Sequence, residues 1–368
     1  MVQDLPEIRD GRHPPGKALN LSFVAGHVLV KEVNWLGDLV ISLPALRAIR
    51  AAYAHARLAV LVKQELASFF DGASWIDEVI PYASGGFFRA PTASLRIANQ
   101  LRSRKFDLAV LFPGSFSSAL WVTLAGIPRR AGYSTDGRGF MLSHRGSPPA
   151  DALAGHQAFY WLAMVRETLG LAPVPDAQHH RLEVGGENLT RMRGWIAKRR
   201  HNADAPLVAI APAAAYGPAK EWPLVRYAAL IDLLATRFGA ETVLVGAPGE
   251  RTKCEQVAAT SKAGALIAAG ETNVGELIAL LSLCQGFAGN DSGAMHLAGA
   301  LWIPTVGIFG STNPNRTGPT GPKAGFIYRP LECSPCLERE CRFGHYNCLR
   351  QITPEEVAAT LAQLGTFA

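Results

Sequence analysis

The chain has 368 residues, of which 48% are hydrophobic and 18% are charged, so it can bury sizeable cores and extensive disorder is excluded. Its length predicts two domains rather than one. The net charge of +6 favours anionic partners such as nucleotides or phosphorylated lipids, although a slightly basic soluble enzyme would have the same balance. No apolar run is long enough to span a bilayer, and residues 1–20 lack the apolar core of a signal peptide, so neither a membrane-spanning nor an exported protein is expected.

The first half of the chain alternates short apolar segments with amphipathic ones. Strands are expected over residues 27–33, 56–62, 77–82 and 106–112, and helices over 39–53, 92–105 and 116–127. Strands that alternate with helices in this way predict a parallel sheet covered by helices. Residues 151–200 are mostly helical in pattern and become polar towards their end.

The alternation restarts after an interruption near residues 186–206. Strands are expected over residues 206–213, 240–248, 265–270, 285–290 and 304–310, and helices over 222–238, 250–262, 273–284, 293–301 and 353–364. The last helix has Thr353 as N-cap and Glu356 three residues on, the pattern of a capping box. Two similar halves predict an α/β protein of two facing, doubly wound domains, whose ligands bind beyond the carboxyl ends of the strands.

Unusual loops follow several of these strands. Asp38 lies in the loop between the first strand and the first helix, where a carboxylate could act as a general base or simply as an N-cap. Lys220 and Gly217 lie in the loop after residues 206–213, just before a helix, and a lysine beside backbone amides there forms an anion site or a plain surface contact. Neither a Walker P-loop nor a nicotinamide fingerprint is present.

Two further loops carry polar groups at a helix start. Glu250 follows the strand at 240–248 and could accept hydrogen bonds from a ribose or offset the helix dipole. Asp291, Ser292 and Gly293 precede the helix at 293–301, where their amides and hydroxyl suit a phosphate or a sugar. His296 follows within that helix and is either a support for the loop or a packed core histidine.

Four of the six cysteines gather in one stretch: Cys333, Cys336, Cys341 and Cys348. Thiols stay reduced in a cytoplasmic chain, so a disulfide framework is not the default. Four thiolates near His345 could hold zinc or an iron–sulfur cluster, but the spacing is not a common zinc pattern, and a surface loop with free thiols is the other interpretation.

From residue 27 to the end, the chain resembles glycosyltransferase family 9, the ADP-heptose:lipopolysaccharide heptosyltransferases. The resemblance lies in NWLGDLVISLPALRAIR, FDLAVLFPGSFSSALWVTLAGIPRRAGY, YGPAKEWP, VLVGAPGE, AGNDSGAMHLAGALWIPTVGIFGSTNP and ITPEEV. NWLGD, GPAK and STDGRGF are most similar to heptosyltransferases II. The family implies a GT-B fold of two Rossmann-like domains, here a tail at 1–25, an acceptor domain at 26–190, a donor domain at 191–350, and a helix at 351–368 that packs back towards the acceptor domain.

The resemblance also implies an inverting reaction that requires no metal, and the lack of a D-x-D acidic pair agrees with this. Asp38 would be the base and Lys220 would balance the charge of the departing ADP. Gly217, Lys220, Glu250, Asp291, Ser292, Gly293 and His296 would bind the donor. Asn34, Gly37, Arg129, Arg130 and Arg138, with His144, would face a lipid A–core acceptor, although solvated surface is an equal interpretation for the arginines.

The implied substrates are ADP-heptose and the inner core (heptose, Kdo and lipid A) of Gram-negative lipopolysaccharide; nucleic acid is not expected. A cytoplasmic location follows, and a lipid-anchored acceptor adds the hypothesis of peripheral contact with the inner membrane. Ala213 and Ala215 stand where heptosyltransferases II usually have Gly and Glu. This departure keeps two other hypotheses open: a transferase for another nucleotide-sugar or acceptor, and a non-catalytic sugar-nucleotide-binding protein or metal-dependent sensor.

Overall fold

The computed structural model describes residues 23–83, 91–171 and 180–367, and of the predicted tail at 1–25 only the last three residues fall within them. Contacts divide the chain into two compact units, which meet in the sequence between residues 179 and 180. This division lies earlier in the chain than the predicted boundary at 190/191. Each unit has its own sheet and its own hydrophobic core.

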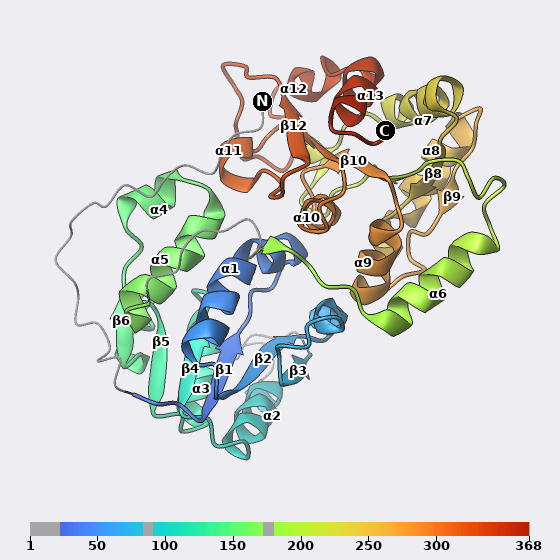
Figure 1. Ribbon diagram of the computed structural model, residues 1–368. Coiled ribbons are helices and arrows are strands. Elements are labelled where there is room, and N and C mark those ends of the chain that lie inside the picture. The colour runs from blue at the N-terminus through green and yellow to red at the C-terminus, as the bar shows by residue number, and fades with distance from the viewer. Residues whose placement is uncertain (1–22, 84–90, 172–179, 368) are drawn as a thin grey trace. The chain divides into compact units, whose positions relative to one another are not determined.

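The first unit is built on six parallel strands in the order β3-β2-β1-β4-β5-β6 (Figure 1). The strands are β1 His27–Lys31, β2 Arg57–Lys63, β3 Glu78–Tyr82, β4 Leu108–Leu111, β5 Arg129–Tyr133 and β6 His144–Gly146. The helices are α1 Leu36–Ala52, α2 Pro91–Arg102, α3 Phe116–Leu124, α4 Ala150–Ala154 and α5 Gln157–Leu169, with 3₁₀ turns at Gln64–Phe70 and Gly139–Met141. The short strands β5 and β6 were not predicted.

Helices cover this sheet because the strands are apolar on both faces. Alternate strand residues such as Leu29, Leu61 and Leu111 form one buried cluster with Leu101 of α2 and Trp121 of α3. Helix α1 packs against α5, and α2 packs against α3. Continuous apolar strands of this kind are typical of a parallel sheet buried on both sides, so the predicted doubly wound arrangement of this unit is confirmed.

The second unit repeats the same plan, with strand order β12-β11-β10-β7-β8-β9 (Figure 1). Its strands are β7 Leu207–Ala211, β8 Glu241–Leu244, β9 Leu266–Ile267, β10 Gly286–Asn290, β11 Thr305–Phe309 and β12 Ala324–Tyr328. Its helices are α6 Gly186–Ala197, α7 Leu224–Phe238, α8 Arg251–Thr260, α9 Val274–Ser282, α10 Gly293–Ala300, α11 Pro314–Thr317, α12 Asn347–Arg350 and α13 Pro354–Gln363. Numbered within each unit, both sheets read 3-2-1-4-5-6, the Rossmann order.

The last helix begins as predicted, since Thr353 accepts from the backbone of Glu356 and the Glu356 side chain accepts from the backbone of Thr353. Its apolar residues Val357, Ala358 and Leu361 are buried in the core of the second unit, where α13 packs against α7. A contact of this helix with the first unit stays a prediction. Among the described residues, no helix combines the length and the apolar character needed to cross a membrane.

Candidate functional site

Each sheet reverses its strand order at one pair of central strands, β1 with β4 and β7 with β10. Loops beyond the carboxyl ends of such strands run in opposite directions and leave a crevice in which ligands bind. Asp38 follows β1, Lys220 follows β7 and Asp291 follows β10. These three predicted site residues therefore lie at the two places where the strand order of a sheet reverses.

In the second unit, Asp291 is the centre of a polar network. Its Oδ2 accepts from Lys220 Nζ at 2.6 Å and from Thr312 Oγ1 at 2.7 Å, while Oδ1 lies 3.8 Å from His296 Nε2. Asp291 is only 5% exposed, whereas the Lys220 side chain is 15% exposed. The carboxylate thus fixes a lysine that still reaches the surface, where its charge can meet an anion. Thr312 was not predicted as a site residue, although its position just after the end of β11 could have indicated one.

Asn290, the last residue of β10, ties three segments together. Its Oδ1 accepts from the backbone of Trp222 at 2.9 Å and from Tyr227 Oη at 2.8 Å, and its Nδ2 donates to Pro212 O at 2.9 Å. The side chain is fully buried, and each of these bonds satisfies a polar group that burial would otherwise leave unpaired. Asn290 therefore holds the loop that carries Lys220 (the Lys220 loop, residues 212–223) against β10. Sequence reasoning missed it because an amide at a strand end looks like a simple turn residue.

Helix α10 begins at Gly293, as predicted, with Ser292 as its N-cap. The Ser292 side chain makes no capping bond, and its buried Oγ has no hydrogen-bond partner among the described residues. A hydroxyl left unsatisfied beside the positive end of a helix dipole suits an anionic oxygen. His296, in the next turn, is 4% exposed and beside Asp291, so it supports the loop from within.

Glu250 lies after β8, in the 3₁₀ turn Pro248–Glu250. Its Oε2 accepts from Ala247 N at 2.7 Å, which caps the turn that leads into α8. One carboxylate oxygen therefore has a structural role that was not predicted, and compensation of the helix dipole is not tested by this bond. Binding of a ribose by the other oxygen stays a prediction.

The Lys220 loop is braced by residues 337–339 of the cysteine-rich segment. Ala219 N donates to Arg339 O at 3.0 Å, and Tyr216 Oη donates to Leu337 O at 2.5 Å. Gly217 has φ of +146°, and a Cβ there would lie 2.6 Å from Arg339 O. The glycine is thus required by this close backbone approach, and a ligand contact of Gly217 stays a prediction.

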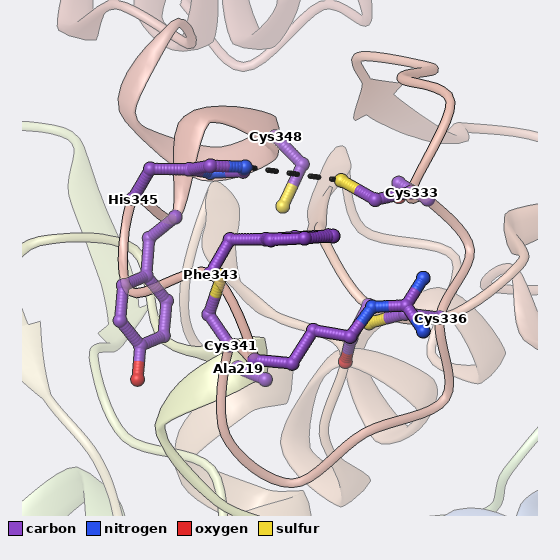
Figure 2. Close-up of a pocket in the computed structure, with 11 residues that line it drawn as sticks. Ala219, Cys333, Cys336, Cys341, Phe343, His345 and Cys348 are labelled. Carbon is purple, nitrogen blue, oxygen red and sulfur yellow. Dashed lines mark hydrogen bonds between the residues drawn. The ribbon is translucent and has the colours of Figure 1, made fainter.

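The four clustered cysteines line one small cavity of about 20 Å³, together with His345 (Figure 2). Cys333 Sγ lies 4.0 Å from His345 Nε2, and the ring of Phe343 lies among the sulfurs. Within residues 23–83, 91–171 and 180–367, no three His, Cys, Asp or Glu side chains are arranged to hold a metal ion. The zinc or iron–sulfur hypothesis therefore gains no support from the geometry and stays a prediction.

In the first unit, α1 begins at Leu36, earlier than the predicted residue 39, so Gly37 and Asp38 belong to the first helical turn. The N-cap is Trp35, which makes no side-chain capping bond. Asp38 is thus not an N-cap, and the capping interpretation is wrong. Its half-buried carboxylate lies at the positive end of the α1 dipole, which favours the ionised form that a general base needs.

The arginines predicted for the acceptor are placed differently. Arg129 and Arg130 begin β5, at the amino edge of the parallel sheet, whereas Asp38 follows the carboxyl end of β1. Arg138 does follow β5 but is fully buried, and its Nε and Nη1 donate to Tyr133 O and Ser118 Oγ, both at 2.9 Å. The structure therefore gives Arg138 a role within the protein, and a contact of these three arginines with acceptor phosphates stays a prediction. Arg138 ties together the loops after β4 and β5.

The geometry of the second unit, with a lysine and an unsatisfied hydroxyl beyond the strand ends, fits a phosphate-bearing ligand. A model of the family described as glycosyltransferase family 9 (heptosyltransferase) matches residues 94–347. The chain belongs to glycosyltransferase family 9. It is 28% identical over 353 residues to lipopolysaccharide heptosyltransferase 2 of Salmonella typhimurium, covering 92% of this chain and 98% of that protein. The heptosyltransferase 2 of Escherichia coli is 27% identical over 354 residues, with the same coverage.

Solved structures agree with this family. The chain superposes on the ADP-heptose lipopolysaccharide heptosyltransferase II of Escherichia coli with a TM-score of 0.78 and 25% identity, covering 92% of this chain and 98% of that one. A family 9 glycosyltransferase of Veillonella parvula gives a TM-score of 0.82 at 20% identity, covering 92% and 97%. The predicted GT-B fold is confirmed, and this family 9 chain is a glycosyltransferase.

Proposed function

We propose that this glycosyltransferase moves L-glycero-D-manno-heptose from ADP-heptose to the inner core of lipopolysaccharide, with inversion at the anomeric carbon. One observation carries the proposal: Lys220, Asp291 and the unsatisfied Ser292 hydroxyl come together beyond β7 and β10. A nucleotide diphosphate needs a cation and N–H or O–H donors at such a place. The relatives named heptosyltransferase 2 supply the identity of the sugar and of the acceptor.

Asp38 is the proposed general base. As an acceptor hydroxyl attacks the anomeric carbon, its proton passes to the Asp38 carboxylate, and the bond from that carbon to the diphosphate oxygen breaks. A positioned base of this kind contributes roughly 10²- to 10⁴-fold to the rate. Lys220 offsets the negative charge that grows on the departing ADP. Glu250 is proposed to hold the ribose, with Asn34 and Gly37 on the acceptor side. No metal takes part in any of these steps.

A change of donor within the same family is the second candidate. Ala213 is buried just after β7, where the resemblance to heptosyltransferases II implies a glycine, and the exposed Ala215 has no carboxylate to offer. A methyl group can keep a phosphate from the backbone, and a lost carboxylate removes a polar contact. Both changes favour a nucleotide-sugar other than ADP-heptose.

An acceptor anchored in lipid would bring the protein to the cytoplasmic face of the inner membrane. The net charge of +6 supports peripheral contact with an anionic surface. Co-sedimentation with acceptor-free vesicles that contain anionic lipid tests this part of the proposal, and protein that stays in the supernatant contradicts attachment by charge alone.

Calorimetric titration with ADP-heptose, ADP-glucose, UDP-glucose and ADP, followed by transfer to a Kdo–lipid A acceptor, tests the function. Selective binding of ADP-heptose with transfer of heptose supports the proposal. Tighter binding of another nucleotide-sugar supports the second candidate. Binding without transfer to any acceptor supports a non-catalytic binding protein and contradicts both.

A further inference from the structure

Two ionisable side chains are buried directly before the turn that carries Asp38. Lys31 is the last residue of β1 and is 1% exposed, and Glu32 follows it and is 0% exposed. The Glu32 carboxylate accepts from Val33 N at 3.2 Å and from Ser42 Oγ of α1 at 3.3 Å. Burying two such groups is costly unless hydrogen bonds and charge pairing offset the loss of water. The proposed reaction gives neither of them a role.

Lys31 and Tyr82 converge on a single oxygen atom. Lys31 Nζ donates to Asn34 Oδ1 at 3.2 Å and also to the Glu32 carbonyl. Tyr82 Oη donates to the same Asn34 Oδ1 at 2.8 Å, and the ammonium lies 4.8 Å from the centre of the Tyr82 ring. Tyr82 is the last residue of β3, so the ends of two strands of one sheet hold one amide.

The chemistry of these donors fixes which way the amide points. A lysine amine donates N–H whether or not it is charged, and burial raises the pKa of Tyr82, so its hydroxyl keeps the proton that it donates. A charged Lys31 can only donate, so it requires the oxygen of Asn34 on its side, and the Tyr82 hydroxyl then donates to the same oxygen. The Nδ2 end of this half-buried residue is left with two N–H donors, which have no partner among the described residues.

We propose that Asn34 donates a hydrogen bond to an oxygen of the acceptor saccharide, next to the hydroxyl that reacts, and that Lys31 and Tyr82 are positioning residues that hold its amide in that orientation. The inference rests on the proposed function, because it takes a saccharide as the molecule that Asp38 deprotonates. Asn34 precedes Asp38 by four residues, and both follow the carboxyl end of β1 where the chain turns into α1, so we expect an oxygen bound by this amide to lie near the base. A preset amide loses little conformational freedom on binding and selects oxygen acceptors over N–H groups.

Asn34→Asp is the sharpest test, because the introduced carboxylate still accepts from Lys31 and Tyr82 but has no N–H to donate. Asn34→Ala removes the donor without adding charge. Both variants are expected to lose roughly ten- to a hundredfold in kcat/KM for the acceptor, while the Kd for ADP and the Tm stay near those of the wild type. Lys63→Met, at the end of the neighbouring strand β2, is the matched control and keeps wild-type kinetics.

A double-mutant cycle separates positioning from stability. Lys31→Met alone is expected to lower acceptor kcat/KM several-fold, and Tyr82→Phe likewise. In the Asn34→Ala background, Lys31→Met should cause no further kinetic loss, since the amide that it orients is gone. Full additivity of the two changes contradicts the positioning role, and wild-type kinetics of both Asn34 variants overturn the inference.

Binding of the water-soluble acceptor saccharide, measured by calorimetry without donor, keeps the two proposals apart. Saccharide binding that depends on Asn34, in a wild-type protein that transfers no heptose, supports this inference and removes the proposed function. Heptose transfer that is unchanged in the Asn34 variants supports the proposed function and overturns this inference. A wild-type protein that neither binds the saccharide nor transfers heptose overturns both.

Discussion

The turn after β1 and the turn after β10 both lie at the point where the strand order of their sheet reverses, yet they use the same residue types differently. After β10, Asn290 is fully buried and uses both ends of its amide inside the protein. After β1, Asn34 is half-buried, and within the described part of the chain only the oxygen of its side-chain amide is bound. One amide completes a scaffold, and the other is held with its donors available.

The aspartates of the two turns differ in the same sense. Asp291 is 5% exposed and bound to Lys220 and Thr312, so its carboxylate holds the lysine in position. Asp38 lies half-buried in the first turn of a helix, where the helix dipole helps to stabilise the carboxylate. A carboxylate paired with a close cation is a poor proton acceptor, because the cation stabilises its ionised form. A role as base therefore suits Asp291 poorly, which agrees with the proposal that Asp38 is the base and that Lys220 and Asp291 belong to the anion site.

The largest expected effect is on Asp38. Asp38→Asn keeps the shape of the side chain but removes its ability to take a proton, so kcat should fall roughly 10²- to 10⁴-fold. The affinity for ADP, measured by calorimetry, should not change. Asp151→Asn, in the first turn of α4, is the control for losing a helix-start carboxylate and should leave kcat intact. If Asp38→Asn retains more than a tenth of kcat, the base lies elsewhere.

Next in size is the effect of separating Lys220 from Asp291. Lys220→Met leaves a buried carboxylate without its cation and should cost roughly 1–3 kcal/mol of unfolding free energy, with roughly tenfold or greater loss of ADP affinity. Lys253→Met, which breaks a pair with Glu221 at a 42% exposed lysine, should cost about 0–1 kcal/mol. Chemical denaturation measures the change in unfolding free energy, and calorimetry measures the change in ADP affinity.

The double variant Lys220→Met/Asp291→Asn sharpens this result. Removing the orphaned charge should recover much of the stability but none of the ADP affinity, because the cation for the diphosphate is still missing. Recovery of both would show that Lys220 acts only through Asp291.

Much of this architecture follows from local patterns. The alternation of apolar and amphipathic segments gives both doubly wound sheets, and the Thr353–Glu356 pair gives the start of α13, because these features depend on neighbours in sequence. The strands β5, β6 and β12 escaped prediction, since RRAGY, HRG and AGFIY are short or rich in glycine and charge. They become strands only because an edge of the sheet is there to pair with.

The site was predictable as a set of loops but not as a set of contacts. Asp, Lys and Ser at strand ends marked the predicted loops, whereas the burial of Arg138 depends on three carbonyl groups from two other segments. The start of α1 was misplaced because Asp is a good N-cap in general, whereas the N-cap here is Trp35, which makes no side-chain capping bond. The sequence did not indicate that Lys31 and Glu32 are buried, because a charged pair at a strand end normally faces water.

A smaller effect is expected from the pH dependence of this buried pair. Burial raises the pKa of Glu32 to about 7, so its stabilising contribution is present at low pH and is lost as the pH rises towards 7. Burial lowers the pKa of Lys31 to about 7, so its contribution is present at high pH and is lost as the pH falls towards 7. Relative to Lys31→Met/Glu32→Gln, the wild type should thus be least stable near pH 7, by on the order of 1–3 kcal/mol. Urea unfolding from pH 5 to 10 measures this difference, and a maximum near pH 7 would contradict it.

The smallest effect concerns two classes of thiol within the second unit. Burial raises the pKa of Cys254 and of Cys284 to about 12, so neither forms a thiolate near neutral pH. The four cysteines around the cavity in Figure 2 are partly exposed. In a metal-free protein, four thiols should therefore react quickly with a disulfide reagent, and two only after unfolding. If zinc or an iron–sulfur cluster is bound, fewer than four react until a chelator is added, and elemental analysis finds the metal in proportion to protein. Six equally reactive thiols would contradict the burial of Cys254 and Cys284, on which the distinction depends.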